Sequence, residues 1–398
     1  MISFTQATNL TEIENAVAAL KDGNETAVRV PTSLRHGGGF GVPVSLIQFF
    51  ATWVRSTRQP PMLKLHAAAA TSNGVENLAQ EPHGMAALYF APAIEASPKE
   101  ITPTKHGLAH AIRRIRAMQS GDFLQTMHGR GVFLACFADA TNEFLLPFYS
   151  KGQADSLRGR EDFSRLTEQI LSACAPGALR TLGARHISSM SNLLYELFRN
   201  TDEHSQTDEK GVQYHRNVRG VIAKYISYSP ESISNDSSND NVPQNLFLLR
   251  TLANQALRKD EQGRQRSTEN VAFLEITVFD TGPGLVKRWL AKNAPTTSID
   301  AIDIQQEMQF VHQCFEQHAT TKDSTVSGHG LSLVLASLKD LNAFLRLRTG
   351  RVSLFQDFSS ISATAKFAPK HGLKDRQTLP YIAGAAYSII IPLSRGEK

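Results

Sequence analysis

The chain has 398 residues, of which 41% are apolar and 20% are charged. This balance excludes a disordered chain and predicts a folded protein with a substantial core, and the length favours two domains over one. No run of eighteen apolar residues occurs, so we expect no membrane-spanning helix.

Charge and cysteine usage narrow the class of protein further. The formal net charge of +5 is a mild excess of positive charge for this length. The densest basic stretch, residues 110–118, is predicted to be a solvated helix face, and nucleic-acid contact is the weaker alternative. Cys136, Cys174 and Cys314 lie far apart, without Cys-x-x-Cys spacing, which favours reduced thiols over a disulfide or zinc site. The first residues lack a basic segment followed by an apolar one, so we expect no secretory signal and a cytoplasmic location.

Strand and helix patterns alternate over the first 150 residues, which predicts an α/β arrangement. The glycine-rich residues 36–41 lack the Gly-Lys-Ser/Thr ending of a phosphate-binding P-loop and are predicted to form a turn. The predicted strands cover residues 26–31, 62–67, 131–139 and 144–149, and the predicted helices cover residues 44–56 and 106–119.

A polar stretch without periodicity, residues 150–162, is predicted to separate two domains. The first, residues 1–155, is an α/β domain of unknown role that would sense a signal or bind a partner. The second covers residues 156–398. Within it, residues 229–245 and 258–270 are predicted to be polar insertions, the former a loop and the latter a charged connector.

A helical pattern over residues 187–204 carries the first candidate site. Glu196, Asn200 and His204 follow one another at four-residue spacing, each displaced by about 40° around the helix axis, so they form a polar stripe beside the apolar face. One interpretation is the solvent side of an amphipathic helix. The other is a carboxylate and an amide at the rim of a pocket, where an amide oxygen suits Mg²⁺ and a carboxylate can deprotonate water.

The second candidate site follows a predicted strand. Alternating β-forming residues run straight into Asp280, Gly282 and Gly284. A carboxylate at a strand tip can accept hydrogen bonds, and glycines beside it let a flat ligand approach the backbone. A tight turn after a strand would have the same composition, so this motif alone leaves both interpretations open.

The third candidate site lies before a predicted helix. Thr321 and Lys322 follow a helical pattern, and Gly328 and Gly330 flank a histidine just before an apolar helical run. Backbone amides at a helix N-terminus and a lysine ammonium group are what a polyphosphate requires. The spacing does not match the dinucleotide-binding Gly-x-Gly-x-x-Gly motif, because Leu333 occupies the last glycine position and no strand precedes it.

Taken in chain order, these features resemble the GHKL family of ATP-binding domains, which includes sensor histidine kinases, DNA gyrase, the ninety-kilodalton heat-shock chaperones and MutL mismatch-repair proteins. The order is Glu-x-x-x-Asn on a helix, Asp-x-Gly-x-Gly after a strand, Thr-Thr-Lys, and Gly-x-Gly-Leu before a helix. Residues 319–333 look most like the lid and second glycine box of sensor kinases, and residues 383–393 are similar to their closing strand. The resemblance covers about residues 165–398.

The resemblance implies a fold, two cofactors and a role for each polar residue. The second domain would be a GHKL α/β sandwich, with helices over a mixed sheet and Mg²⁺-bound ATP between them, preceded by the smaller α/β domain. Asn200 would bind Mg²⁺, and Glu196 would be the general base for water. His204 would lie near phosphate or ribose. Asp280 would accept a hydrogen bond from the adenine amino group.

The resemblance also implies roles for the glycines and the lid. Gly282 and Gly284 would shape the adenine pocket. The residues implied for the lid and for phosphate contact are Thr321, Lys322, Gly328, Gly330 and Leu331.

Two departures from the family pattern leave the activity open. Ser332 stands where sensor kinases usually have another glycine. His110 and His186 lie on helical stretches, but neither is followed by the acidic residue and proline of a phosphoacceptor segment. We therefore expect an ATPase that acts as a switch on a protein partner or as a homodimer. The alternatives are a protein kinase and a regulatory module that binds ATP without hydrolysing it.

Overall fold

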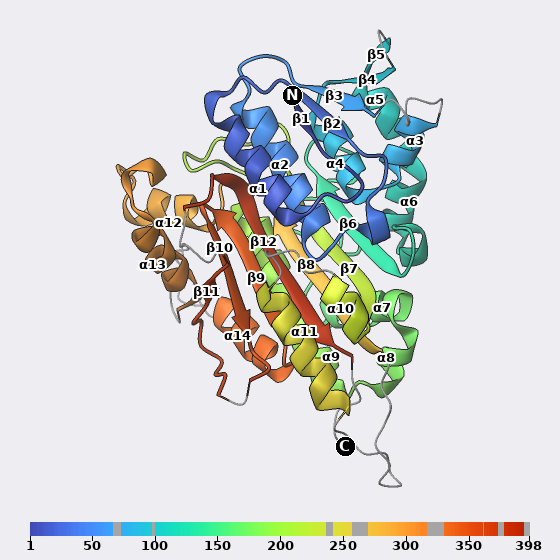
Figure 1. The fold of residues 1–398 in the computed structure, drawn as a ribbon, viewed down its shortest axis with the longest axis vertical. Coiled ribbons are helices and arrows are strands. Elements are labelled where there is room, and N and C mark those ends of the chain that lie inside the picture. The colour runs from blue at the N-terminus through green and yellow to red at the C-terminus, as the bar shows by residue number, and fades with distance from the viewer. Residues whose placement is uncertain are drawn as a thin grey trace.

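The structure, a computed structural model, describes residues 1–66, 73–97, 100–235, 242–256, 270–316, 330–360, 362–372 and 378–393. Within these ranges the fold is α/β, as predicted, and its helices pack on two sheets (Figure 1). None of the helices in these ranges is long and apolar enough to cross a membrane.

The larger sheet has seven strands in the order β11-β10-β9-β12-β8-β7-β6, and each neighbouring pair is antiparallel. The expected mixed sheet is therefore wrong for this part of the chain. The last strand, β12, is inserted between β8 and β9, so these two strands, which run in the same direction, do not pair with each other. The strands are β6 (Gly131–Phe137), β7 (Val218–Tyr228), β8 (Val271–Asp280), β9 (Phe344–Gly350), β10 (Val352–Asp357), β11 (Lys370–His371) and β12 (Ile382–Pro392).

Helices cover both faces of this sheet. We call the face that bears Leu274 and Ile276 the inner face, and the face that bears Phe273 and Thr277 the outer face. The inner face packs against α7 (Arg160–Cys174) and α9 (Ala184–His204), and α14 (Gly330–Asp340) packs beside α9. On the outer face, α10 (Pro230–Asn235) and α11 (Val242–Ala256) cover a cluster that includes Phe273. The remaining helices in this part are α8 (Pro176–Thr181), α12 (Leu285–Asn293) and α13 (Ile304–Phe315).

The smaller sheet has the order β1-β2-β3-β4-β5. Its first four strands are parallel, and β5 is an antiparallel edge strand. The strands are β1 (Ile2–Ser3), β2 (Ala27–Val30), β3 (Met62–Leu65), β4 (Ala93–Ser97) and β5 (Glu100–Pro103). The helices in this part are α1 (Leu10–Ala19), α2 (Val42–Ser56), α3 (Gly74–Ala79), α4 (Pro82–Phe90), α5 (Thr104–Leu108) and α6 (Ile112–Ser120).

Helix α2 joins the two parts of the molecule. Residues 42–53 are all buried, as in a helix enclosed on every side. Phe49 packs edge-on against Phe4 beside the smaller sheet, while the Gln48 amide donates to the Ala383 carbonyl of β12 at 3.0 Å. One hydrophobic cluster therefore runs through both parts. The division near residue 155 remains a prediction, but β6, which precedes it, belongs to the larger sheet.

Three local predictions need correction. The predicted strand over residues 144–149 is wrong, because Pro147 cannot donate to a ladder and the amides of Phe148 and Tyr149 both bond to the Leu145 carbonyl. The predicted loop over 229–245 contains α10 and the start of α11. The helix predicted over 106–119 is split into α5, a 3-10 turn and α6, and its Arg114 is buried, donating to Gln80 and Gln125 rather than facing solvent.

Candidate functional site

Asp280 is the last residue of β8 and is buried on the inner face of the sheet. Burial raises the pKa of its carboxyl group to about 7, although hydrogen bonds from the Gly282 and Ala385 amides and the charges of Arg55 and Arg288 oppose this shift. The Gly282 amide lies 2.8 Å from Oδ1. A carboxyl group with this pKa changes charge near neutral pH, which is frequent in functional sites.

The two glycines after Asp280 are required by close backbone approaches. A Cβ atom at Gly282 would lie 2.6 Å from the Ser205 Cα, at the end of α9. Gly284 has φ of +79°, which favours glycine, and a Cβ there would lie 2.8 Å from the Thr349 Oγ1. The loop after β8 is therefore pressed against α9 on one side and β9 on the other.

Tyr387 connects Asp280 with the polar stripe of α9. It lies on β12 opposite Val278, so its side chain emerges on the inner face. Burial raises its pKa well above the usual value, and the nearby Asp280 charge adds to this effect. The Asn200 amide nitrogen lies 3.5 Å from the Tyr387 hydroxyl oxygen. The structure thus brings the Asn200 and Asp280 motifs to one place, with a buried phenol between them.

Glu196 is buried one helical turn before Asn200, and two arginines surround its carboxylate. Arg160, the first residue of α7, forms an ion pair with Oε1. The Arg199 guanidinium lies 2.8 Å from Oε2, yet no donor reaches Oε2 with hydrogen-bond geometry. Glu196 is therefore charge-compensated on both sides.

Helix α14 begins directly over this carboxylate. A Cβ atom at Gly330 would lie 2.6 Å from the Glu196 Oε2, so only glycine fits there without a shift. The far end of α14 is also fixed to α9, since Asp340 accepts from the Ser189 hydroxyl at 2.6 Å and pairs with Arg185. Leu331, which follows Gly330 in α14, is partly buried and packs against the core. The third motif thus meets the first in the structure.

His204 and three residues of the third motif complete the predicted set. His204 ends α9 half-buried, and its backbone carbonyl accepts from Arg288 at 2.8 Å. Thr321, Lys322 and Gly328 lie outside the described residues, so their predicted roles remain predictions.

Four arginines near Asp280 and Glu196 escaped the sequence analysis because no motif marks them. Arg55, at the end of α2, donates to the Thr281 carbonyl and lies 3.8 Å from the centre of the Tyr214 ring. Burial lowers its pKa. The others are Arg160 on α7, Arg199 on α9 and Arg288 on α12. Tyr387 was also missed, although it had a detectable signal as a lone tyrosine in an apolar strand.

The described part of the chain contains no group of three or more His, Cys, Asp or Glu side chains that could hold a metal ion. Mg²⁺ commonly takes most of its oxygen ligands from substrate phosphates and water.

We compared the chain with protein-family models, with curated proteins and with solved structures, and none of the three comparisons returned a match.

Proposed function

We propose that this protein binds Mg²⁺-ATP in a GHKL-type site and uses it as a conformational switch acting on a protein partner or a second copy of the chain. The proposal rests chiefly on the meeting of three separate sequence motifs around one buried group of side chains. Asp280 faces Asn200 across Tyr387, and Gly330 lies against Glu196. In the same proposal, residues 156–398 with β6 form the GHKL sandwich, and the smaller α/β part transmits the signal.

The residues at the Asp280 end suit an adenine base. A buried carboxylate at the strand tip can accept a hydrogen bond from the adenine amino group, and Gly282 and Gly284 keep side chains away from the loop. The ring of Tyr387 lies beside them and is fully buried. The donation stabilises the ionised form of Asp280, so adenine binding would lower a pKa that stands at about 7 in the free protein.

The residues at the Glu196 end suit phosphate. Helix α14 has eleven residues and begins at Gly330, so its N-terminal amides can bind an anion. The Asn200 side-chain oxygen can contribute to a Mg²⁺ shell completed by phosphate oxygens and water. Arg160 and Arg199 add positive charge near this end. ATP bound here would supply the negative charge that these groups neutralise.

Glu196 can accept a proton from water only after it loses one of its arginines. Both guanidinium groups contact it in this structure, and water must displace one of them to reach the carboxylate. This observation favours slow hydrolysis coupled to a rearrangement around α7 or α14. It also supports the second candidate, a module that binds ATP without hydrolysing it.

Titration calorimetry with Mg²⁺-ATP tests the binding proposal. We expect binding by the wild type and a loss of at least about tenfold in affinity for Asp280→Asn, because the oxygen that remains accepts from the Gly282 amide and the side-chain nitrogen cannot accept from adenine. Wild-type affinity for adenosine, which has no phosphate to titrate, should fall as the pH drops below about 7, while the affinity of Asp280→Asn stays level. Equal affinity of both proteins for ATP would refute the proposal.

Measuring the release of phosphate from ATP then distinguishes a switch ATPase from a module that only binds ATP. A switch ATPase releases phosphate slowly, and Glu196→Gln abolishes release while retaining ATP binding. A module that only binds ATP shows no release in either protein. Labelled ATP incubated with candidate partners detects the kinase alternative by transfer of label to protein.

A further inference from the structure

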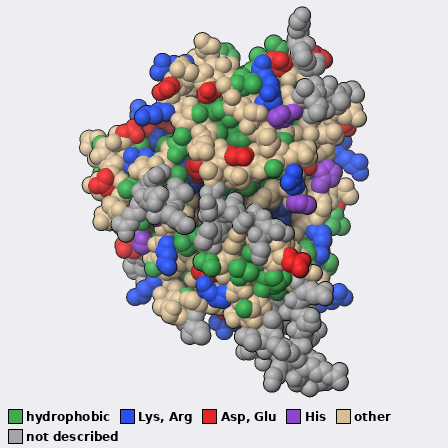
Figure 2. Space-filling model, viewed as in Figure 1, with side chains coloured by type: hydrophobic (Ala, Val, Ile, Leu, Met, Phe, Trp, Pro, Cys, Tyr) green, Lys and Arg blue, Asp and Glu red, His purple; other side chains and the backbone are tan. Residues whose placement is uncertain are grey.

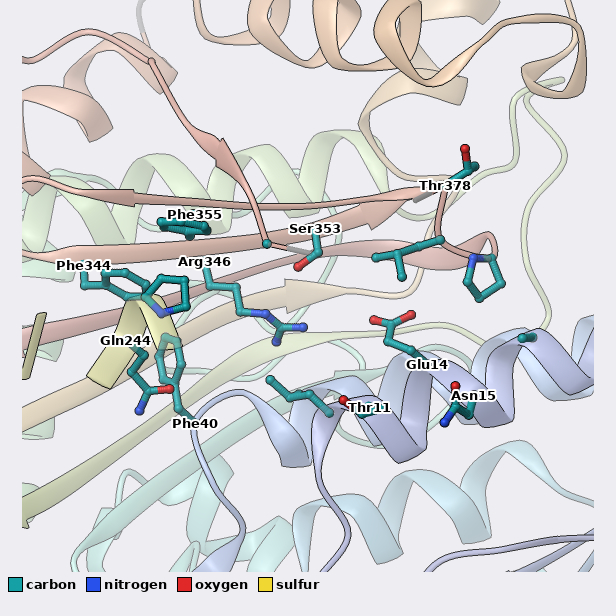
Figure 3. A pocket seen from close by; sticks show the side chains of 16 residues that line it. Thr11, Glu14, Asn15, Phe40, Gln244, Phe344, Arg346, Ser353, Phe355 and Thr378 are labelled. Carbon is teal, nitrogen blue, oxygen red and sulfur yellow. The ribbon is translucent and has the colours of Figure 1, made fainter. Parts of the chain in front are cut away.

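A second pocket, of about 350 Å³, opens on the outer face of the larger sheet, opposite the candidate ATP site (Figure 3). Its walls come from α1, from β9 and β10, from the start of α11 and from residues 378–380. Ligand pockets in proteins have volumes of about 300–1,000 Å³, so this pocket can enclose a small molecule.

One end of the pocket is aromatic. Phe40, Phe344 and Phe355 line it, and the ring centres of Phe344 and Phe355 lie 6.0 Å apart with an interplanar angle of 21°. Phe40 tilts against Phe344 at 6.1 Å. Leu10 adds an apolar side chain from α1. Aromatic rings attract one another at such distances and bury a large apolar area, so this end of the pocket suits an aromatic ring of a ligand.

A buried amide lies at the aromatic end. Gln244, near the start of α11, is 4% exposed and lines the pocket, and its Oε1 has no hydrogen-bond partner among the described residues. In Figure 3 its side chain lies beside Phe40. An unsatisfied buried polar atom is destabilising, and a ligand group that bonds to this amide would remove that cost. A hydroxyl group can both donate and accept, so it suits either orientation of the amide.

Glu14 and Arg346, the titratable side chains among the described lining residues, already have partners. Both carboxylate oxygens of Glu14 accept from the buried guanidinium of Arg348, each at 2.8 Å. Arg346 is likewise engaged within the protein. A charged ligand loses its hydration on entering the pocket, and it would have to compete with an existing partner for either side chain. A neutral ligand would leave both contacts in place, so the lining favours a neutral ligand.

We propose that this pocket binds a small neutral aromatic molecule that carries a hydroxyl group. The aromatic ring lies against Phe40, Phe344 and Phe355, and the hydroxyl group bonds to the Gln244 amide. The charged side chains of the pocket keep their present partners. The proposal concerns the opposite face from the ATP site and does not depend on ATP binding.

The test uses four matched probes on the full chain without nucleotide, measured by titration calorimetry. The probes are 4-ethylphenol, ethylbenzene, which lacks the hydroxyl group, the anion 4-ethylbenzoate and the cation 4-ethylbenzylammonium. We expect 4-ethylphenol to bind most tightly. Ethylbenzene should bind about fivefold to tenfold more weakly, because it leaves the Gln244 amide unsatisfied. Each charged probe should bind at least about tenfold more weakly than 4-ethylphenol.

Two variants assign the contacts. Gln244→Met keeps the length of the side chain and should remove the preference for 4-ethylphenol over ethylbenzene. Phe355→Ala shortens a half-buried side chain of the aromatic end and should weaken binding of both neutral probes about tenfold. The matched controls lie on α13, which does not line the pocket. They are Gln305→Met at an exposed position and Phe310→Ala at a half-buried one, and both should bind like the wild type.

Three results would overturn the proposal. The first is no binding of 4-ethylphenol at millimolar concentration. The second is binding of ethylbenzene or of either charged probe at least as tightly as 4-ethylphenol. The third is an unchanged preference for 4-ethylphenol over ethylbenzene in a folded Gln244→Met protein. If that variant does not fold, the ranking of the four probes on the wild type decides alone.

Discussion

The two faces of the larger sheet carry different kinds of site on the same strands. On the inner face, β12 presents Tyr387 towards Asn200, and β8 ends in Asp280. On the outer face, the next residue of β12, Ser388, pairs across the sheet with Arg346 of β9, which lines the second pocket. Alternation of side chains along a strand places neighbouring residues on opposite faces. A ligand on either face therefore contacts strands that also shape the other site.

The two faces also differ in the groups that build them. The inner-face site depends on glycines and on one buried carboxyl group whose charge changes near neutral pH. The outer-face pocket depends on α1, held by a buried ion pair, and on aromatic rings. In Figure 2, acidic and basic side chains are scattered over the visible face. Changes of pH and methyl groups added at glycines should therefore alter the stability of the protein through the inner face. Loss of an ion pair should alter it through the outer face.

The largest expected effect is the pH dependence of stability that comes from Asp280. Its pKa is raised to about 7 in the folded protein, so the folded state holds a proton that the unfolded state releases near pH 4. Wild-type stability should therefore fall by up to about 1.4 kcal/mol per pH unit between about pH 4 and pH 7, and by roughly 4 kcal/mol in all. Urea unfolding at several pH values measures this decline.

Asp280→Asn is the control for this effect. The variant cannot ionise, so its stability relative to the wild type should increase from about pH 4 to about pH 7. If the stability difference between the two proteins does not change with pH, Asp280 does not carry a raised pKa.

The next effect concerns the ion pair on the outer face. Glu14→Gln leaves the Arg348 guanidinium buried, at 1% exposure, without its charge partner. Removing one member of a buried pair typically costs about 3–5 kcal/mol. We expect the lower value of about 3 kcal/mol, because Arg348 also donates to the Gly350 and Pro380 carbonyls. Urea unfolding near neutral pH measures it, and a cost below about 1 kcal/mol would show that α1 is not anchored by this pair.

The difference between the faces also explains how much the sequence could predict. The strand before Asp280 and the helix that bears Glu196 follow from periodicity, and glycines at fixed spacing mark close backbone approaches. The second pocket has no such signal, because Arg346, Gln244 and Phe40 are common residue types brought together only by tertiary packing. The same holds for Arg160 and Arg55, which reach the inner-face site from other elements.

Two features of the larger sheet could not be predicted from the sequence, for a similar reason. The antiparallel order of the larger sheet depends on the insertion of β12 between β8 and β9, a long-range choice that local patterns do not encode. The membership of β6 in that sheet depends equally on pairing with β7 across a polar stretch that resembles a linker. Helix α11 was missed because it follows a stretch rich in serine and asparagine.

A smaller effect on the inner face concerns Gly330. Gly330→Ala places a methyl group 2.6 Å from the Glu196 Oε2, and this carboxylate cannot move freely because Arg160 and Arg199 hold it. We expect a net loss of about 1–2 kcal/mol, since the clash outweighs the helix propensity gained by alanine. Chemical unfolding measures it.

Gly177→Ala is the matched control for Gly330→Ala. Gly177 lies in the first turn of α8, and a Cβ atom there has open space within 4 Å. We expect this variant to change stability by less than about 1 kcal/mol, in the stabilising direction. Equal effects of the two substitutions would mean that α14 does not press on Glu196.

The smallest expected effect is the loss of the exposed ion pair on the inner-face side. Arg185 pairs with Asp340 at the end of α14, but its side chain is 83% exposed. Arg185→Met should cost less than about 1 kcal/mol, because water screens such pairs and ordering two long side chains has an entropic cost. The Ser189 hydroxyl still binds Asp340 in the variant, so α14 stays in place. The effect should shrink further in about 1 M salt. A cost near that of Glu14→Gln, insensitive to salt, would contradict the distinction between the two faces.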